Sequence, residues 1–211
     1  MPTPPTDLDF GTREERDRQY NARATVADFD ACMREYAESS ALARQQCVGI
    51  HDLRYGMGVA ERLDLFLPAS ARRPAPLLIF IHGGYWRALR KEDSAMMAKV
   101  FTDAGVAVAT LEYPLLPEAT LPETVREVRS AVAWLHRHGA AYGIDPDRMY
   151  ASGSSAGGHL IGMLLASGWQ ASYGLPPVAI QGGVGLSGLY DIQPLCDTHI
   201  NDWLRLTPEQ A

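Results

Sequence analysis

The feature that most constrains the fold is a serine between two glycines, at a point where the hydrophobic pattern changes. Gly153-Ser154-Ser155-Ala156-Gly157 follows a short apolar run at 149–151 and precedes an apolar stretch that begins at Leu160. The first run predicts a buried strand and the second predicts a helix, so the motif lies at a strand-to-helix turn. Such a turn strains the backbone of its central residue, and the flanking glycines let strand and helix pack closely. Ser155 is therefore the candidate nucleophile.

A second motif lies roughly 70 residues upstream, as two intervening strand-helix units require. Residues 76–81 have the pattern of a central strand and are followed by His82-Gly83-Gly84-Tyr85-Trp86. When a serine occupies a strand-to-helix turn, the loop after this strand donates backbone N–H groups to the oxyanion of the reaction. We therefore predict Gly83, Gly84 and Ala156 as oxyanion-hole donors, the last because it follows the nucleophile at the start of a helix. His82 is expected to hold this loop by hydrogen bonding.

Together these motifs resemble the α/β-hydrolases, and within them the branch of kynurenine formamidase (arylformamidase) and similar small carboxylesterases. The resemblance extends to Gly-Ile-Asp-Pro at 143–146 and Leu-Ser-Gly-Leu-Tyr-Asp at 186–191, and covers the chain from about Tyr20 onward. It implies acyl-enzyme chemistry on Ser155, a small-molecule ester or aryl formamide as substrate, and neither a metal nor an organic cofactor. Tyr85 and Trp86 either line a substrate-binding pocket for aromatic groups or pack their loop against the core.

The order of elements predicts an α/β fold with a mostly parallel, doubly wound sheet and helices on both faces. Residues 1–12 are proline-rich and expected to form a disordered tail, and 13–211 form a single domain that begins with a helical segment at 13–47. That segment either covers the mouth of the active site or packs on the edge of the sheet. The remaining expected elements are an antiparallel strand pair at 48–55 and 59–67, strands at 106–111 and 178–186, and helices at 92–104 and 122–138. In the helix at 92–104, Met96, Met97, Val100 and Phe101 are expected on one face.

Charge and cysteine content exclude several other classes of protein. The net charge is −6 without a long basic or acidic run, which argues against nucleic acid or an anionic membrane surface as partner. The three cysteines are scattered and match neither a disulfide framework nor a zinc site, as is typical of a reducing cytosol. The N-terminus lacks the pattern of a secretory signal, and no stretch has the length of a membrane span. We therefore predict a cytoplasmic protein, with a homodimer as a possible assembly.

The sequence does not supply a clear acid and base for Ser155. In this fold both follow the nucleophile, on later strands. His159 is one turn along the same helix and is expected to be structural, while Asp191 and His199 are only eight positions apart, too close for an intervening strand and crossover. Asp191 resembles a turn-forming residue. The last strands and helix of the fold are thus missing, which predicts a piece of a longer hydrolase. The alternative is a catalytically inactive binding or dimerisation module whose open sheet edge pairs with another chain.

Overall fold

The computed structural model describes residues 11–69 and 74–211, so most of the predicted disordered tail lies outside the described residues. Within these ranges the strands are β1 (Val48–Arg54), β2 (Arg62–Leu67), β3 (Ala75–Ile81), β4 (Ala107–Leu111), β5 (Ile144–Ser154) and β6 (Gly183–Leu186). The α-helices are α1 (Arg13–Gln19), α2 (Phe29–Gln46), α3 (Ala98–Asp103), α4 (Leu121–His138), α5 (Ala156–Leu165) and α6 (Asn201–Leu204). Short 3-10 turns are η1 (Ala22–Thr25), η2 (Lys91–Ser94), η3 (Gly139–Tyr142), η4 (Gln170–Tyr173) and η5 (Gln193–Asp197).

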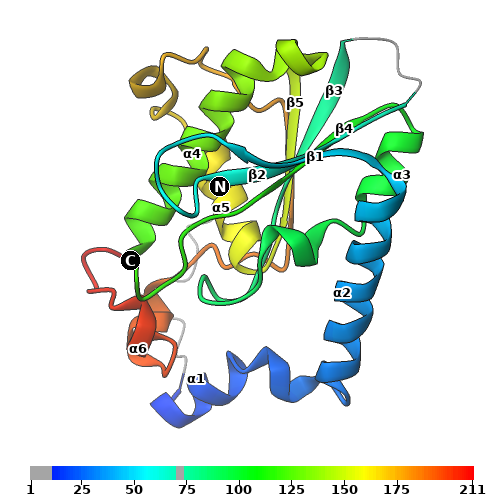
Figure 1. The fold of residues 1–211 in the computed structure, drawn as a ribbon. Coiled ribbons are helices and arrows are strands. Elements are labelled where there is room, and N and C mark those ends of the chain that lie inside the picture. Colours follow the sequence, from blue (N-terminus) through cyan, green and yellow to red (C-terminus); the bar gives the residue numbers. More distant parts are fainter. Residues whose placement is uncertain (1–10, 70–73) are drawn as a thin grey trace, which may run out of the picture.

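The six strands form one mixed sheet in the order β1-β2-β4-β3-β5-β6. β1, β2 and β4 pair antiparallel in turn, whereas β4, β3, β5 and β6 run parallel to one another. Helices α4 and α5 lie on one side of this sheet and α2 and α3 on the other (Figure 1). This is the doubly wound α/β architecture that the sequence predicts. The carboxyl ends of β3, β4 and β5 therefore meet at one edge, which is where ligands bind in such folds.

Helix α4 forms as its sequence predicts. Thr120 accepts a hydrogen bond from the N–H of Glu123, and the Glu123 carboxylate accepts one from the N–H of Thr120, so two free donors at the helix start are satisfied. Four apolar residues at helical spacing form a stripe on the inner face of the helix, and all four are buried: Val125, Val128, Val132 and Leu135. A long amphipathic stripe with a capping box makes this helix predictable from local sequence alone.

The expected helix at 92–104 is wrong in both its extent and its inner face. The chain forms η2, a bend and then the short helix α3, and Val100 is 70% exposed instead of buried. The small residues Ala98 and Thr102 face the core. The reason is long-range, because η2 is turned inward so that Lys91 reaches the carboxylate of Asp64 at 2.8 Å inside the sheet.

Asp64 on β2 attaches the N-terminal helix α2 to the sheet. Its fully buried carboxylate accepts hydrogen bonds from Lys91, from Arg44 of α2 and from the N–H of Asp52. Burial alone would raise the pKa of Asp64, but these donors outweigh it and hold the pKa below its usual value. Helix α2 is thus tied to the sheet through Arg44, and it packs against η2 and α3. In contrast, the residues before α2 approach the predicted oxyanion loop, since the Tyr85 hydroxyl donates to the carbonyl of Tyr20. That the segment covers the mouth of an active site stays a prediction.

No helix in the ranges 11–69 and 74–211 is both long and apolar enough to cross a membrane.

Candidate active site

Ser155 occupies the turn between β5 and α5, as predicted. Its backbone angles are φ 54° and ψ −116°, a conformation that a non-glycine residue adopts only under strain of about 1–3 kcal/mol. Two main-chain hydrogen bonds hold it there. The Ser155 N–H donates to the carbonyl of Leu186 at 2.7 Å, and its carbonyl accepts from the N–H of His159 at 3.1 Å. The side chain is only partly buried, so it remains accessible at the carboxyl edge of the sheet.

Positions 153 and 157 must be glycine, because a side chain at either position would clash with neighbouring backbone. A Cβ at Gly157 would lie 2.1 Å from the carbonyl oxygen of Ile81 on β3, and one at Gly153 would lie 2.6 Å from the carbonyl group of Gly157. Helix α5 therefore touches the backbone of both β3 and β5. This close packing fixes the tip of the turn, and it confirms the role expected for the two glycines.

The predicted oxyanion loop lies directly against Ser155. A Cβ added at Gly83 would meet the Ser154 carbonyl oxygen at 2.8 Å and the Cβ of Ser155 at 3.3 Å. In the described part of the chain, no hydrogen bond uses the N–H of Gly83 or Gly84. The N–H of Ala156 points out of the first turn of α5, where backbone donors have no helical partner. The arrangement leaves three donors near Ser155, and their use in stabilising an oxyanion stays a prediction.

Tyr85 and Trp86, which follow the two glycines, lie in different environments. The Trp86 side chain is fully buried and meets the ring of His159 edge to face, with centroids 5.2 Å apart. This placement favours the packing interpretation for Trp86. Tyr85 is half-buried, and its carbonyl accepts a hydrogen bond from the indole of Trp203 at 3.1 Å. A substrate-binding role for either residue stays a prediction, and Tyr85 is the more accessible of the two.

His82 contacts the backbone of the predicted oxyanion loop, as the sequence predicts. Its fully buried ring stacks on Tyr113 with centroids 4.1 Å apart, and Nδ1 is 2.9 Å from the carbonyl oxygen of Gly83. Because a carbonyl oxygen only accepts, Nδ1 carries the proton in this contact.

Glu112 and Tyr113, at the carboxyl end of β4, were not identified from the sequence. Their position after a buried strand parallel to β3 is the signal that could have indicated them, since parallel strands end at the same edge.

In the described residues no imidazole contacts the Ser155 hydroxyl. His159 is buried beside Trp86, and its pKa is lowered to about 4 by burial, so the ring is neutral. His199 is bound to Asp17 of α1 through both its N–H, at 2.6 Å, and Nδ1, at 2.9 Å. Asp191 accepts a hydrogen bond from the N–H of Gln193, which is the turn-forming role expected for it. The structure does not assemble a triad from these residues.

His159 should make stability depend on pH. Burial lowers its pKa from 6.5 to about 4, so between these values the unfolded chain binds a proton that the folded chain excludes. Stability that is present above pH 6.5 is therefore lost as the pH falls toward 4, by roughly 3 kcal/mol in total. We expect His159→Gln to remove this part of the pH dependence in urea unfolding measured between pH 4 and 7.

The control for this measurement is His138→Gln, because His138 is exposed at the end of α4. It should leave the pH dependence of stability as in the wild type. Equal slopes for wild type and His159→Gln would contradict a neutral, buried His159.

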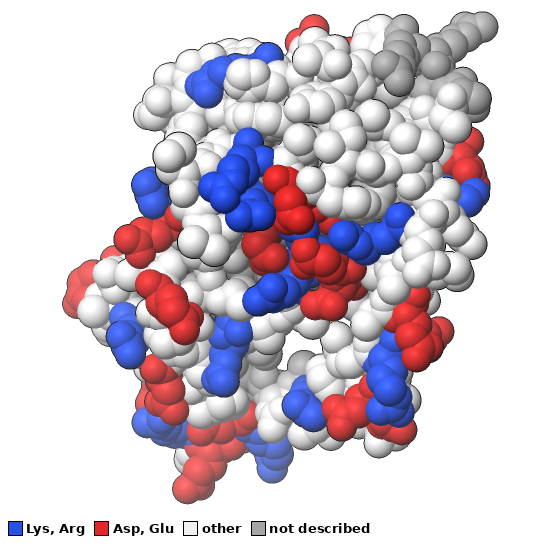
Figure 2. Space-filling model, in the orientation of Figure 1, with Lys and Arg blue, Asp and Glu red and all other residues white. Residues whose placement is uncertain are grey.

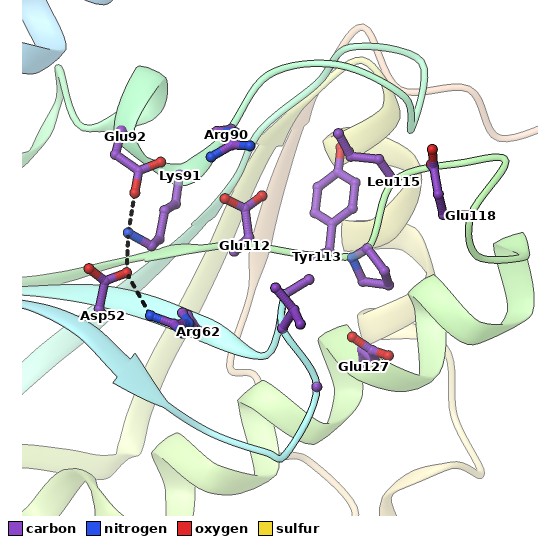
Figure 3. A pocket seen from close by; sticks show the side chains of 14 residues that line it. Asp52, Arg62, Arg90, Lys91, Glu92, Glu112, Tyr113, Leu115, Glu118 and Glu127 are labelled. Atoms are coloured by element: carbon purple, nitrogen blue, oxygen red, sulfur yellow. Dashed lines mark hydrogen bonds and ion pairs between the residues drawn. The ribbon is translucent and has the colours of Figure 1, made fainter.

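Beside the oxyanion loop the sheet edge carries a polar pocket of about 640 Å³ (Figure 3). Charged side chains of both signs line it, among them Asp52, Arg62, Lys91, Glu92 and Glu112. Lys91 is paired with Asp52, Asp64 and Glu92, and Arg62 with Asp52. On this face of the molecule blue and red side chains lie intermixed (Figure 2), without a field of one sign.

Comparison with known proteins agrees with this geometry. The BD-FAE family model matches residues 63–173, more than half of the chain. Kynurenine formamidase of Salmo salar is 34% identical over 82% of this chain and 57% of its own length, and that of Danio rerio is 35% identical over 80% and 56%. The chain thus spans just over half the length of these relatives. A crystal structure of a proposed thioesterase from Silicibacter sp. TM1040 superposes with a TM-score of 0.78 at 31% identity, covering 94% of this chain and 72% of that one. The chain belongs to the BD-FAE family, has the α/β-hydrolase fold and is a relative of kynurenine formamidase.

Proposed function

We propose that the native protein is a serine hydrolase that cleaves carboxylic esters or aryl formamides of small molecules through an acyl-enzyme on Ser155. The observation that carries this proposal is the strained Ser155, at the start of α5, with the backbone of Gly83 against it. A fold maintains such strain only where the surrounding packing over-determines it, and it does so mostly at functional sites. The family relationship to kynurenine formamidase supports the same reaction class.

The proposed reaction is acyl transfer. The Ser155 hydroxyl would give its proton to an imidazole, which the described residues do not place beside it, as its oxygen bonds to the substrate carbonyl carbon. The carbonyl oxygen becomes an oxyanion, which the N–H groups of Gly83, Gly84 and Ala156 would stabilise. Loss of one such donor typically raises the barrier by ~2.7–4 kcal/mol. The carbon then releases an alcohol or arylamine, which takes up the proton, and water cleaves the acyl-enzyme to a carboxylic acid or to formate.

The second candidate function is an inactive binding or dimerisation module. The observation that favours it is that no imidazole within 11–69 or 74–211 is hydrogen-bonded to Ser155. The intact turn and the free N–H groups of the oxyanion loop oppose it, because a binding module has no need of a strained serine. A cytoplasmic location and a homodimer stay predictions under either function.

Labelling and a paired substrate screen separate the two functions. We expect a fluorophosphonate to add to Ser155 of the native protein, located by peptide mass spectrometry, because only an activated serine reacts. We also expect turnover of p-nitrophenyl acetate, an activated short-chain ester. Faster cleavage of N-formylaniline at equal concentration would narrow the substrate class to aryl formamides. Binding of either compound with neither turnover nor adduct would overturn the hydrolase proposal and favour the binding module.

A further inference from the structure

Two side chains beneath the predicted oxyanion loop contact its carbonyl groups. The one O–H proton of Tyr113 is shared between the carbonyl oxygens of His82 at 3.1 Å and of Gly83 at 3.0 Å. Nδ1 of His82 also contacts the Gly83 carbonyl oxygen. The two consecutive carbonyls are therefore held by Tyr113 in common, and that of Gly83 has the imidazole as a further donor.

In a trans peptide the carbonyl and the following N–H point in opposite directions, because the peptide unit is planar. Fixing the carbonyl of His82 fixes the direction of the Gly83 N–H, and fixing the carbonyl of Gly83 does the same for the N–H of Gly84. These are the two loop donors that the proposed function requires. Neither has a partner among the described residues, so both remain available to a substrate oxygen.

Tyr113 is well suited to this task. Its side chain is 1% exposed, and its ring is fixed against the imidazole of His82 in a nearly parallel stack with an interplanar angle of 15°. Burial, and secondarily the charge of Glu112, raise the pKa of Tyr113 well above its usual value. The hydroxyl therefore keeps its proton and remains a donor at neutral pH.

Glu112 faces the other nitrogen of His82. Among the described residues Nε2 is buried without a hydrogen-bond partner, and Glu112 Oε1 lies 3.4 Å from it. Glu112 lines the polar pocket beside the loop, next to Tyr113 (Figure 3). Glu112 beside Nε2 and the stacked ring of Tyr113 together restrict the orientation of the imidazole, so that Nδ1 stays directed at the loop.

We propose that Tyr113 and Glu112 are positioning residues of the hydrolase site, which direct the N–H groups of Gly83 and Gly84 through the carbonyls of the loop and the ring of His82. This inference rests on the proposed function, because it concerns the donors of the same reaction. It adds the two residues that follow β4, neither of which is hydrogen-bonded to Ser155 in the described part of the chain.

The test is Tyr113→Phe in the native protein, which removes the hydroxyl and retains the stacked ring. We expect kcat for p-nitrophenyl acetate to fall roughly 10- to 100-fold, somewhat less than for loss of a donor, with KM within about twofold. The ¹H and ¹⁵N amide resonances of Gly83 and Gly84 should shift. The matched control is Tyr55→Phe, since this tyrosine is also buried and its hydroxyl donates to the carbonyl of Glu112 at 2.9 Å instead of to the loop.

A second pair of variants tests Glu112. Glu112→Gln should retain most of the activity, because its amide can donate to the free Nε2 of a neutral His82, whereas Glu112→Ala should lower kcat. Equal kcat for Tyr113→Phe and Tyr55→Phe, with unmoved Gly83 and Gly84 resonances, would overturn the positioning role. Equal kcat for Glu112→Ala and wild type would overturn the part played by Glu112. If the native protein turns over no ester or formamide, the proposed function fails, and the amide resonances alone then decide whether Tyr113 orients the loop.

Discussion

Ser155→Ala should abolish turnover of esters and aryl formamides by the native protein, together with its labelling by fluorophosphonates. The hydroxyl oxygen is the atom that bonds to the substrate carbon, so no step of the acyl-enzyme route remains without it. Removal of a serine nucleophile lowers kcat by about 10⁶-fold in well-studied hydrolases, and any residual rate comes from the oxyanion donors and substrate binding. The variant should fold normally, because Ser155 is held by its main-chain N–H and carbonyl.

The matched control is Ser154→Ala, one position earlier in the same motif. Ser154 is the last residue of β5, and it lines an apolar hollow together with Val184 and Leu186 of β6. Its side chain has no role in the proposed reaction, so labelling and kcat should stay close to those of the wild type. The opposite pattern, with Ser154→Ala inactive and Ser155→Ala active, would make Ser154 the nucleophile and would contradict the proposal.

Sequence patterns predict those parts of the structure in which neighbours along the chain decide the conformation. The turn at Ser155 is one example, because the alternation of glycines, the apolar strand before it and the helix after it are all local. Helix α4 is another, since its capping box and apolar stripe lie within one continuous segment. In both cases the local preferences agree with the final packing, and the prediction is confirmed.

The parts that could not be predicted depend on contacts between distant segments. The expected helix at 92–104 breaks because Lys91 pairs with Asp64, a residue of β2 that no local pattern connects to it. Met96 and Met97 line an apolar hollow, and Met97 also packs against the small core cluster around Phe66. Tyr113 and Glu112 could not be assigned for the same reason, because only the alignment of β4 beside β3 places them under the loop of His82. The candidate site thus combines a motif that is local in sequence with residues that the pairing of distant strands brings beside it.

Gly157→Ala should strongly destabilise the fold, although alanine is the better helix former by about 1 kcal/mol. The new Cβ would lie 2.1 Å from the carbonyl oxygen of Ile81 and 2.7 Å from that of His82, both backbone atoms that cannot rotate away. Helix α5 would have to move off β3. We expect a loss of about 3 kcal/mol or more in the free energy of unfolding, equivalent to a Tm lower by roughly 10 °C for a chain of this size.

Gly162→Ala, one and a half turns further along α5, is the control that separates packing from helix propensity. Its Cβ would meet only the ring edge of Tyr190 at 3.3 Å, and that side chain is 64% exposed and free to shift. We expect its stability to lie within about 1 kcal/mol of the wild type, on the stabilising side, because helix propensity then decides the sign. Thermal unfolding followed by circular dichroism measures both variants. Similar Tm values for the two would mean that α5 does not touch β3 closely, and the strained conformation of Ser155 would then lose its structural support.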